Sequence, residues 1–129
     1  MFNQIFATGF SDTDTLGHIN NSKFPIWFEN ARDPVFKIFT PDLDPHKWKL
    51  ILAKIEVEFV AQSFYGKDIE VKTYVSRIGG SSFVVAQEAY QDEVMVARGL
   101  ATLVYFDYQN QTSIALEGHL KEELKKHLI

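Results

Sequence analysis

The stretch SDTDTLGHINNSKFPIWFENARDPVFKI, residues 11–38, joins a polar loop to an amphipathic segment. Between residues 22 and 38 apolar side chains recur every three or four positions, the spacing of one helix face: Phe24, Trp27, Phe28, Ala31, Val35 and Ile38. Asn21 or Ser22 can cap the start, and Pro34 should end or kink the helix near Asp33. The stretch therefore predicts a long helix with a buried aromatic face.

On either side of this helix the sequence predicts strands. Residues 2–10 read as a short first strand, and residues 40–45 read as a loop. After residue 50 the apolar period becomes two, which predicts strands around residues 55–59, 69–75, 83–87 and 94–107. Short turns at 66–67, 79–80 and 91–93 favour an antiparallel meander, and a leucine stripe between 116 and 128 predicts a final helix. The expected class is α+β.

Composition limits the function classes. The chain has 129 residues, 46% of them hydrophobic, which predicts a single domain over residues 1–129. A net charge of −4 argues against nucleic acid as a partner. There is no cysteine, no visible signal peptide and no apolar run near the roughly 20 residues that span a membrane. We therefore expect a cytoplasmic protein that binds neither nucleic acid nor membrane.

The loop at residues 11–21 has three interpretations. Asp12, Asp14 and Gly17 match the start of a calcium-binding EF-hand loop, but Leu16 and Lys23 stand where oxygen ligands are needed. A second interpretation is a structural loop, in which aspartate and asparagine bond nearby backbone. In the third, the helix start polarises a carbonyl oxygen and an aspartate acts on the same carbonyl as general base or nucleophile. Hydrolysis of an activated acyl group requires these two parts.

The same residues resemble a known family. Asp12-Thr13-Asp14, Gly17-His18-Ile19-Asn20-Asn21 and Phe28-Glu29-Asn30-Ala31-Arg32 together are similar to the motifs of the 4-hydroxybenzoyl-CoA thioesterase-like family. The resemblance implies the hotdog fold, a long central helix wrapped by a curved antiparallel sheet of about five strands, here with a short C-terminal helix. It also implies a homodimer or homotetramer with active sites between subunits.

The resemblance further implies an acyl-CoA thioesterase that uses neither cofactor nor metal. Asp14 would be the catalytic carboxylate, and the backbone N–H of Asn21 would hold the thioester carbonyl oxygen. Substrate-binding roles are expected for two loop residues, three aromatic residues of the helix and one turn: His18, Asn20, Phe24, Trp27, Phe28, Gly80, Ser81 and Ser82.

Several alternatives stay open from the sequence. Asp14 can act as general base or as nucleophile, and the acyl carrier can be coenzyme A or an acyl carrier protein. A non-catalytic acyl-CoA binding or sensing domain is the competing class, since a fold does not fix a function. Glu29 and Arg32 are interpreted as an exposed or interface pair. The acyl group itself is not readable from the residues.

Overall fold

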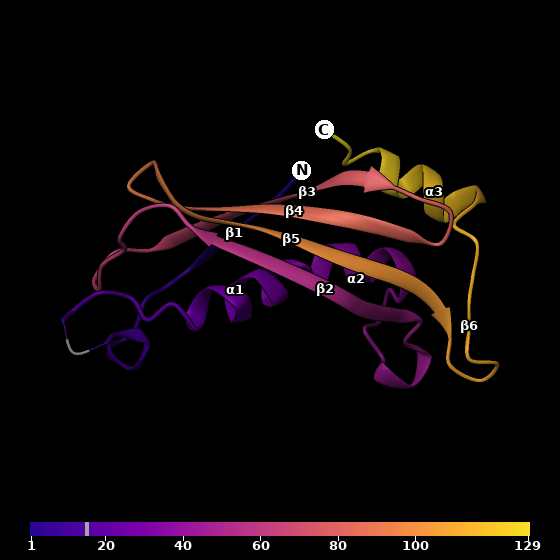
Figure 1. Cartoon of the computed structure of the whole chain (residues 1–129), viewed down its shortest axis with the longest axis horizontal. Helices are drawn as coiled ribbons and strands as arrows, with labels where there is room; N and C mark the ends of the chain where they lie inside the picture. Colours follow the sequence, from indigo (N-terminus) through magenta and orange to yellow (C-terminus); the bar gives the residue numbers. More distant parts are fainter. Residues whose placement is uncertain (15) are drawn as a thin grey trace.

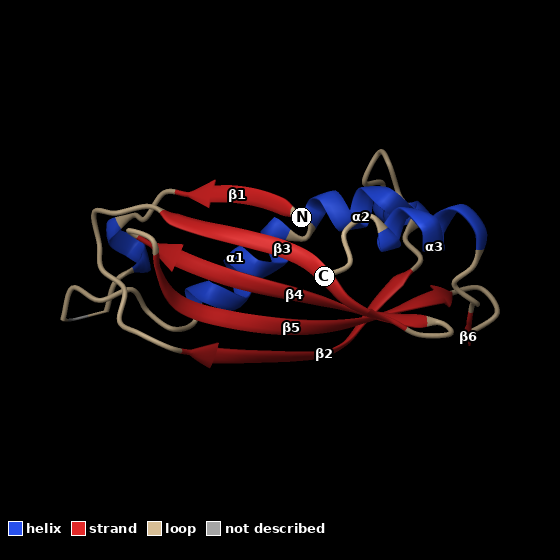
Figure 2. Cartoon of the chain, turned by 90° about the horizontal axis from the view of Figure 1, so that it is seen from above, coloured by secondary structure: helices blue, strands red, loops and turns tan. Residues whose placement is uncertain are grey.

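A curved antiparallel sheet covers the helices α1 and α2 in the computed structural model, which describes residues 1–14 and 16–129 (Figures 1 and 2). The sheet order is β1–β3–β4–β5–β2, and a short β6 pairs with β5. The strands are β1 Phe2–Phe6, β2 Leu50–Phe59, β3 Ile69–Ile78, β4 Ser82–Gln91, β5 Val94–Asp107 and β6 Thr112–Ser113. The helices are α1 Lys23–Ala31, α2 Asp33–Phe39 and α3 Gly118–Lys125. None of the helices described here is long and apolar enough to cross a membrane.

The expected long helix is divided in two. α1 ends at Ala31, Arg32 forms the junction, and α2 begins at Asp33 with Pro34 in its first turn. Proline has no backbone N–H and clashes with the turn before it, so it fits the start of a helix better than its interior. The interruption predicted near Asp33 is confirmed, whereas a single helix over residues 22–38 is wrong.

The sheet is also not a simple meander. β3, β4 and β5 follow one another as hairpins, but β2 pairs with β5 at the far edge. Residues 60–68 therefore cross the end of the sheet instead of forming a tight turn, and the long strand β5 lies inside the sheet. β5 therefore has a neighbour on each side and presents no free edge for pairing with another chain. The free edge belongs to β2, where Leu52, Ile55 and Phe59 are exposed.

A bulge in β2 decides which side chains face the helices. Leu52 pairs with Leu103 and Lys54 pairs with Thr102, so Ala53 is an extra residue in the ladder. An extra residue reverses the alternation of side chains along a strand. The apolar side chains before and after the bulge thus share one face: Leu50, Leu52, Ile55, Val57 and Phe59.

The core has two apolar halves. One lies around α1 and contains Phe24, Trp27, Phe28, Ile69, Val71, Ala89 and Ala97; the other lies around α2 and α3 and contains Val35, Leu50, Val75, Phe83, Val85, Leu116 and Leu124. The buried polar side chains of Arg32, Thr73 and Gln87 lie between these halves in sequence and register. Gln87 Nε2 donates hydrogen bonds to the backbone oxygen of Phe28 (2.7 Å) and to Thr73 Oγ1 (3.1 Å), which ties α1 to the sheet.

The C-terminal segment extends the other edge. α3 buries Leu124, but the expected leucine stripe does not reach Leu128, which leaves the helix and bridges Val75 of β3 in parallel. The N–H of Val75 donates to His127 O (2.9 Å), and Ile129 N–H donates to Val75 O (3.1 Å). β1 and this segment together cover the edge of β3, which leaves β2 as the long uncovered strand.

Candidate active site

The loop before α1 holds the carboxylate of Asp14 by backbone amides. Asp14 Oδ1 accepts hydrogen bonds from the N–H groups of Leu16 (2.8 Å) and His18 (3.2 Å), and Asp14 N–H donates to His18 O (2.8 Å). Gly17 has φ 78°, a conformation that a side chain disfavours. The loop therefore fixes the direction of the Asp14 carboxylate.

Asp12 and Asn20 shape the loop through hydrogen bonds with its backbone. Asp12 Oδ2 accepts from Gly9 N–H (2.8 Å), and Asp12 O accepts from Asn20 N–H (2.8 Å). Asn20 Oδ1 accepts from Ser22 N–H (2.9 Å), which closes a turn directly before α1. Asp12 is thus bonded to backbone, as a structural loop requires.

The turn directly before α1 contains an amide, that of Asn21, without an acceptor among the described residues. Lys23 N–H donates to Asn20 O (3.1 Å), but within the described chain no acceptor is found for Asn21 N–H. The first amides of a helix lack intrahelical acceptors and carry partial positive charge. This free donor and the fixed carboxylate border one hollow of about 350 Å³, lined by Asp14, His18, Ile19, Asn20, Asn21, Phe24, Phe59, Ala61, Gln62 and Ser63.

The crossing segment after β2 forms the opposite wall, which the sequence did not reveal. Ser63 O accepts from Ile19 N–H (3.0 Å), and the Phe64 ring meets the His18 ring edge-on at 5.2 Å between centroids. Buried Gln91 fixes this segment, because its amide group exchanges two 2.8 Å hydrogen bonds with the backbone of Phe64. In the sequence, Gln91 stands next to Asp92 and Glu93 in a predicted turn. Nothing in that pattern indicates that its side chain is buried.

Within a single chain, the residues expected to bind substrate do not all line the same hollow. Phe24 lines the hollow, but Trp27 packs against Phe6 in the core, with ring centroids 6.4 Å apart. The turn with Gly80, Ser81 and Ser82 lies at the opposite end of the sheet, where Tyr105 N–H donates to Ser81 O (2.8 Å). Asp14 itself is exposed in the single chain. The hollow is therefore open on one side.

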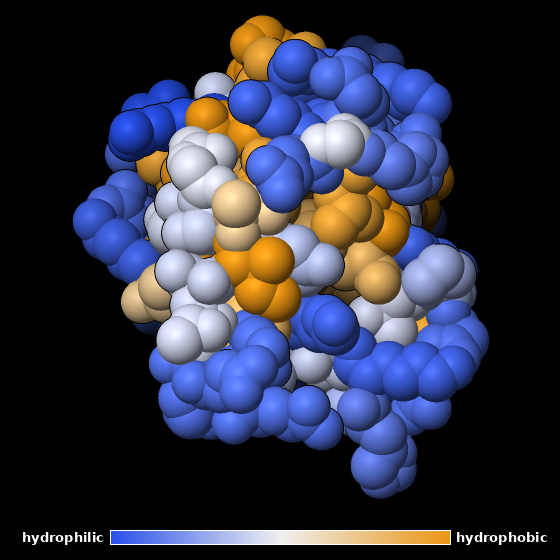
Figure 3. All heavy atoms as spheres, turned by 90° about the vertical axis from the view of Figure 1, so that its right-hand side faces the viewer, coloured by the Kyte–Doolittle hydropathy of each residue, from blue (hydrophilic) through white to orange (hydrophobic). Residues whose placement is uncertain are grey.

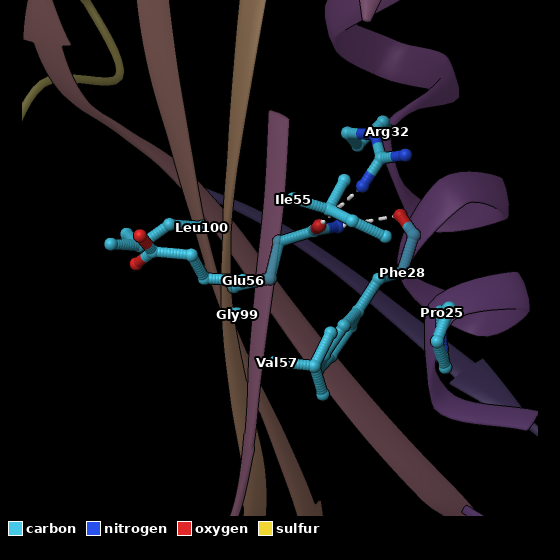
Figure 4. Close-up of a pocket in the computed structure, with 9 residues that line it drawn as sticks. Pro25, Phe28, Arg32, Ile55, Glu56, Val57, Gly99 and Leu100 are labelled. Atoms are coloured by element: carbon cyan, nitrogen blue, oxygen red, sulfur yellow. Dashed lines mark hydrogen bonds between the residues drawn. The ribbon is translucent and has the colours of Figure 1, made fainter. Parts of the chain in front are cut away.

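Arg32 is buried, although the sequence was interpreted as placing it in an exposed or interface pair with Glu29. Glu29 is exposed, but Arg32 is only 4% exposed, so an exposed pair is wrong. Arg32 Nη1 donates to Gln87 Oε1 (3.2 Å), as Figure 4 shows, while Nε is buried without a hydrogen-bond partner in the described chain. Burial lowers the pKa of Arg32, and the negative charge of Glu29 opposes that shift. Its position four residues after Phe28, on the apolar face, was the signal for burial.

A second and larger hollow lies at the other end of the molecule. It measures about 630 Å³ and is lined by Leu43, Pro45, His46, Trp48 and Tyr108. Figure 3 views this end and shows apolar atoms surrounded by polar ones. Among the described residues, no group of three or more histidine, aspartate or glutamate side chains is placed to hold a metal ion.

Comparison with known proteins gives consistent matches. Residues 8–125 match the family model of the thioesterase-like superfamily. A predicted thioesterase from Bacillus stearothermophilus is 34% identical, with a TM-score of 0.95 over 99% of this chain and 96% of that one. A thioesterase from Thermus thermophilus, solved with coenzyme A and Zn, is 25% identical, with a TM-score of 0.84 over 97% and 92%. The Escherichia coli (strain K12) long-chain acyl-CoA thioesterase FadM is 24% identical over 134 residues, 98% of each chain.

Proposed function

Since the chain belongs to the thioesterase-like superfamily of hotdog-fold thioester hydrolases, we propose that it hydrolyses an acyl-CoA to the free acid and coenzyme A. The proposal places the reaction in the hollow of Asp14 and Asn21. Relatives that act on long-chain acyl-CoA or bind coenzyme A support this substrate class.

The proposed mechanism uses two groups of the residues that border the hollow. The Asn21 N–H donates to the thioester carbonyl oxygen and stabilises the negative charge that develops there. As a general base, Asp14 takes a proton from water, whose oxygen attacks the carbonyl carbon; the carbon–sulfur bond then breaks and the thiolate receives a proton. As a nucleophile, the Asp14 carboxylate instead attacks the carbonyl carbon, and the carbon–sulfur bond breaks to release the thiolate, which takes up a proton. Water then hydrolyses the resulting anhydride to the free acid and the Asp14 carboxylate. Both routes use the same two groups.

One observation supports this assignment above the others. The Asp14 carboxylate is fixed by two backbone amides, and it shares its hollow with an amide that is free in the turn directly before α1. A purely structural aspartate would need the first feature but not the second. His18 orients the loop by its backbone, and its ring packs on Phe64, so we assign it no proton transfer.

The open side of the hollow favours a dimer, in which a second copy of the chain would cover it. β2 is a ten-residue free edge with exposed apolar side chains. Two such edges pairing antiparallel around a twofold axis would place Phe59 of one chain near Leu50 of the partner subunit. That arrangement brings the partner's end of the sheet, which carries the turn at residues 80–82, toward the hollow. We propose a homodimer, which can associate further to a homotetramer, in which this turn borders the substrate.

A thiol-release assay tests the activity and its residues. Wild-type protein should release thiol from acyl-CoA, and Asp14→Asn should lower kcat by about 10²–10⁴-fold because the variant keeps the Oδ1 acceptor but loses the base. Asp42→Asn, an exposed site in the loop before β2, is the matched control and should keep wild-type turnover. Equal turnover in wild type and Asp14→Asn would refute the role of Asp14.

Two further measurements separate the alternatives. The same assay with acyl groups on an acyl carrier protein shows which carrier is used, since a higher kcat/KM with the protein thioester would favour that substrate. Binding of acyl-CoA without any thiol release would favour a sensing domain. Sedimentation velocity at micromolar concentration should give a dimer or tetramer; a monomer alone would contradict the paired β2 edges.

A further inference from the structure

Arg32 is a buried cation without a complete set of partners. Its guanidinium offers five N–H donors, yet the described chain provides one hydrogen bond, from Nη1 to Gln87 Oε1. Nε is buried and unpaired, and no described carboxylate oxygen lies within the 4.0 Å of an ion pair. A buried polar donor is normally paired, because leaving it unpaired is costly. The Nε donor is therefore available to a hydrogen-bond acceptor from outside the described chain, such as a ligand oxygen or a water molecule.

Arg32 lines two spaces between the helices and β2. On one side is a crevice of about 10 Å³, bordered by Phe28, Ile55 and Gln87 among others and drawn in Figure 4. On the other side is a hollow of about 280 Å³ lined by Glu29, Arg32, Phe36, Trp48, Leu50, Leu52 and Leu103. The crevice has the volume of about one water-sized oxygen, whereas the hollow can hold several carbon atoms.

These spaces belong to one apolar seam that begins at the candidate active site. On the strand side the bulge aligns the apolar residues of β2 from Phe59 to Leu50. On the helix side Phe24 faces Phe59, with ring centroids 5.9 Å apart, and Phe36 faces Trp48 at 5.2 Å. Phe24 and Phe59 also line the hollow of Asp14. The seam is thus the line along which the helices pack on β2, from that hollow, past Arg32, to the hollow of about 280 Å³ beside Trp48, and the spaces along it are separate in the single chain.

Resting on the proposed function, we propose that this seam takes the acyl chain and that Arg32 selects chains carrying a neutral oxygen acceptor, a hydroxyl or keto group. Eleven residues separate Asn21 from Arg32, which is about 16 Å along the helices, and the arginine side chain leans back toward the helix start. The oxygen would therefore lie well along the chain, away from the thioester.

A neutral oxygen fits this position better than a carboxylate. The crevice accommodates one oxygen-sized group, and a carboxylate brings two oxygens. Glu29 also faces the larger hollow, so it would repel a second negative charge there. A hydroxyl or keto oxygen accepts from Nε without that repulsion.

The experiment compares acyl-CoAs of one chain length that carry a single hydroxyl or keto oxygen at different carbons of the acyl chain. Thiol release is measured for a set of saturated acyl-CoAs that are unsubstituted, hydroxylated or oxidised to the ketone at successive carbons, and for the matching ω-carboxylates. Wild type should favour one narrow range of distal hydroxyl or keto positions by about 10–100-fold in kcat/KM over the unsubstituted chain, the effect of one hydrogen bond to a charged donor. A flat profile, as expected if a water molecule alone occupies the crevice, would overturn the selection.

Variants test whether Arg32 is the donor. Arg32→Met keeps the apolar stem and Arg32→Lys keeps the charge, but both lack Nε, so both should lose the preference between paired substrates. Because the readout is a ratio within one variant, a partial loss of folded protein cancels. Arg77→Met, which removes an exposed guanidinium on β3, should keep the wild-type ratio. An unchanged ratio in both Arg32 variants would refute the assignment.

Binding of free acids separates this inference from the proposed function. Calorimetry should show that wild type binds the distally hydroxylated fatty acid more tightly than the plain acid, and that Arg32→Met removes the difference. Thiol release without positional preference would remove the selection and leave the thioesterase. Positional preference in binding without thiol release from any acyl-CoA would leave the selection and remove the hydrolysis. Absence of preference in both assays overturns the inference.

Discussion

Gly99 of β5 controls how closely α1 approaches the sheet. A Cβ at this position would lie 3.0 Å from Cδ2 and Cε2 of Phe28 and 3.2 Å from Glu56 O. Both distances are shorter than ordinary contact, so Gly99→Ala must push the Phe28 ring, and α1 with it, away from β5. Phe28 is 2% exposed and has little free space to move into. Overpacking of this kind costs about 1–3 kcal/mol.

The net loss is smaller than that cost. Alanine also restricts the unfolded chain, which stabilises the protein by about 0.4–1 kcal/mol. We therefore expect a net destabilisation of about 0.5–2 kcal/mol, which lowers Tm by about 2–8 °C for a chain of this size. Because Asn21 is joined to α1 through Ser22 alone, a shift of α1 should also lower kcat/KM.

Thermal unfolding by circular dichroism measures the effect against a matched control. Gly80 has no atom within 4 Å of the place of a Cβ and no positive φ, so Gly80→Ala should leave Tm unchanged or raise it. A Gly99→Ala protein as stable as Gly80→Ala would refute the claim that Phe28 and β5 are in closest possible contact.

Three other predictions concern the polar core, the C-terminal segment and the loop. Gln87→Leu should cost about 2–4 kcal/mol in urea unfolding, because it leaves the buried Arg32 without its hydrogen bond; a loss under 1 kcal/mol would contradict this role. Burial lowers the pKa of His127, so the unfolded chain binds its proton first and stability falls as pH drops below about 6.5. His127→Phe should flatten the fall of Tm between pH 7.5 and 5.5, and an identical profile would count against it. Gly17→Ala and Gly118→Ala both place a side chain at positive φ and should each cost about 1–2 kcal/mol, but only Gly17→Ala should lower kcat.

The local elements were predictable because their apolar periods are strong. The period of two gave β3, β4 and β5 close to their observed bounds, and the helical spacing before Pro34 gave α1. The pairing of β2 with β5 was not predictable in the same way. It depends on contacts between residues 38 to 55 positions apart, and the segment after β2 reads equally well as a turn or as a crossing.

The candidate site was predictable only in its first part. The Asp14 loop and the helix start are adjacent in sequence, so local chemistry and the motif identify them together. The opposite wall is formed by Ala61, Gln62 and Ser63 of the crossing segment, which Gln91 holds in place through the backbone of Phe64. Arg32 was misread because a charge three residues after Glu29 usually marks a solvated surface, whereas its place on the Phe28 face is buried.

The extra residue at Ala53 gives β2 one position where its length can change. Almost any small side chain can stand at this exposed position, and its deletion would leave Leu50 and Leu52 on the same face as Ile55, because alternation through the shortened strand keeps the same phase. A deletion at a paired position such as Glu56 would instead turn part of the apolar side chains of β2 away from the helices. Natural or designed relatives can therefore lose the residue at the bulge, while a change of length elsewhere in this strand must be compensated.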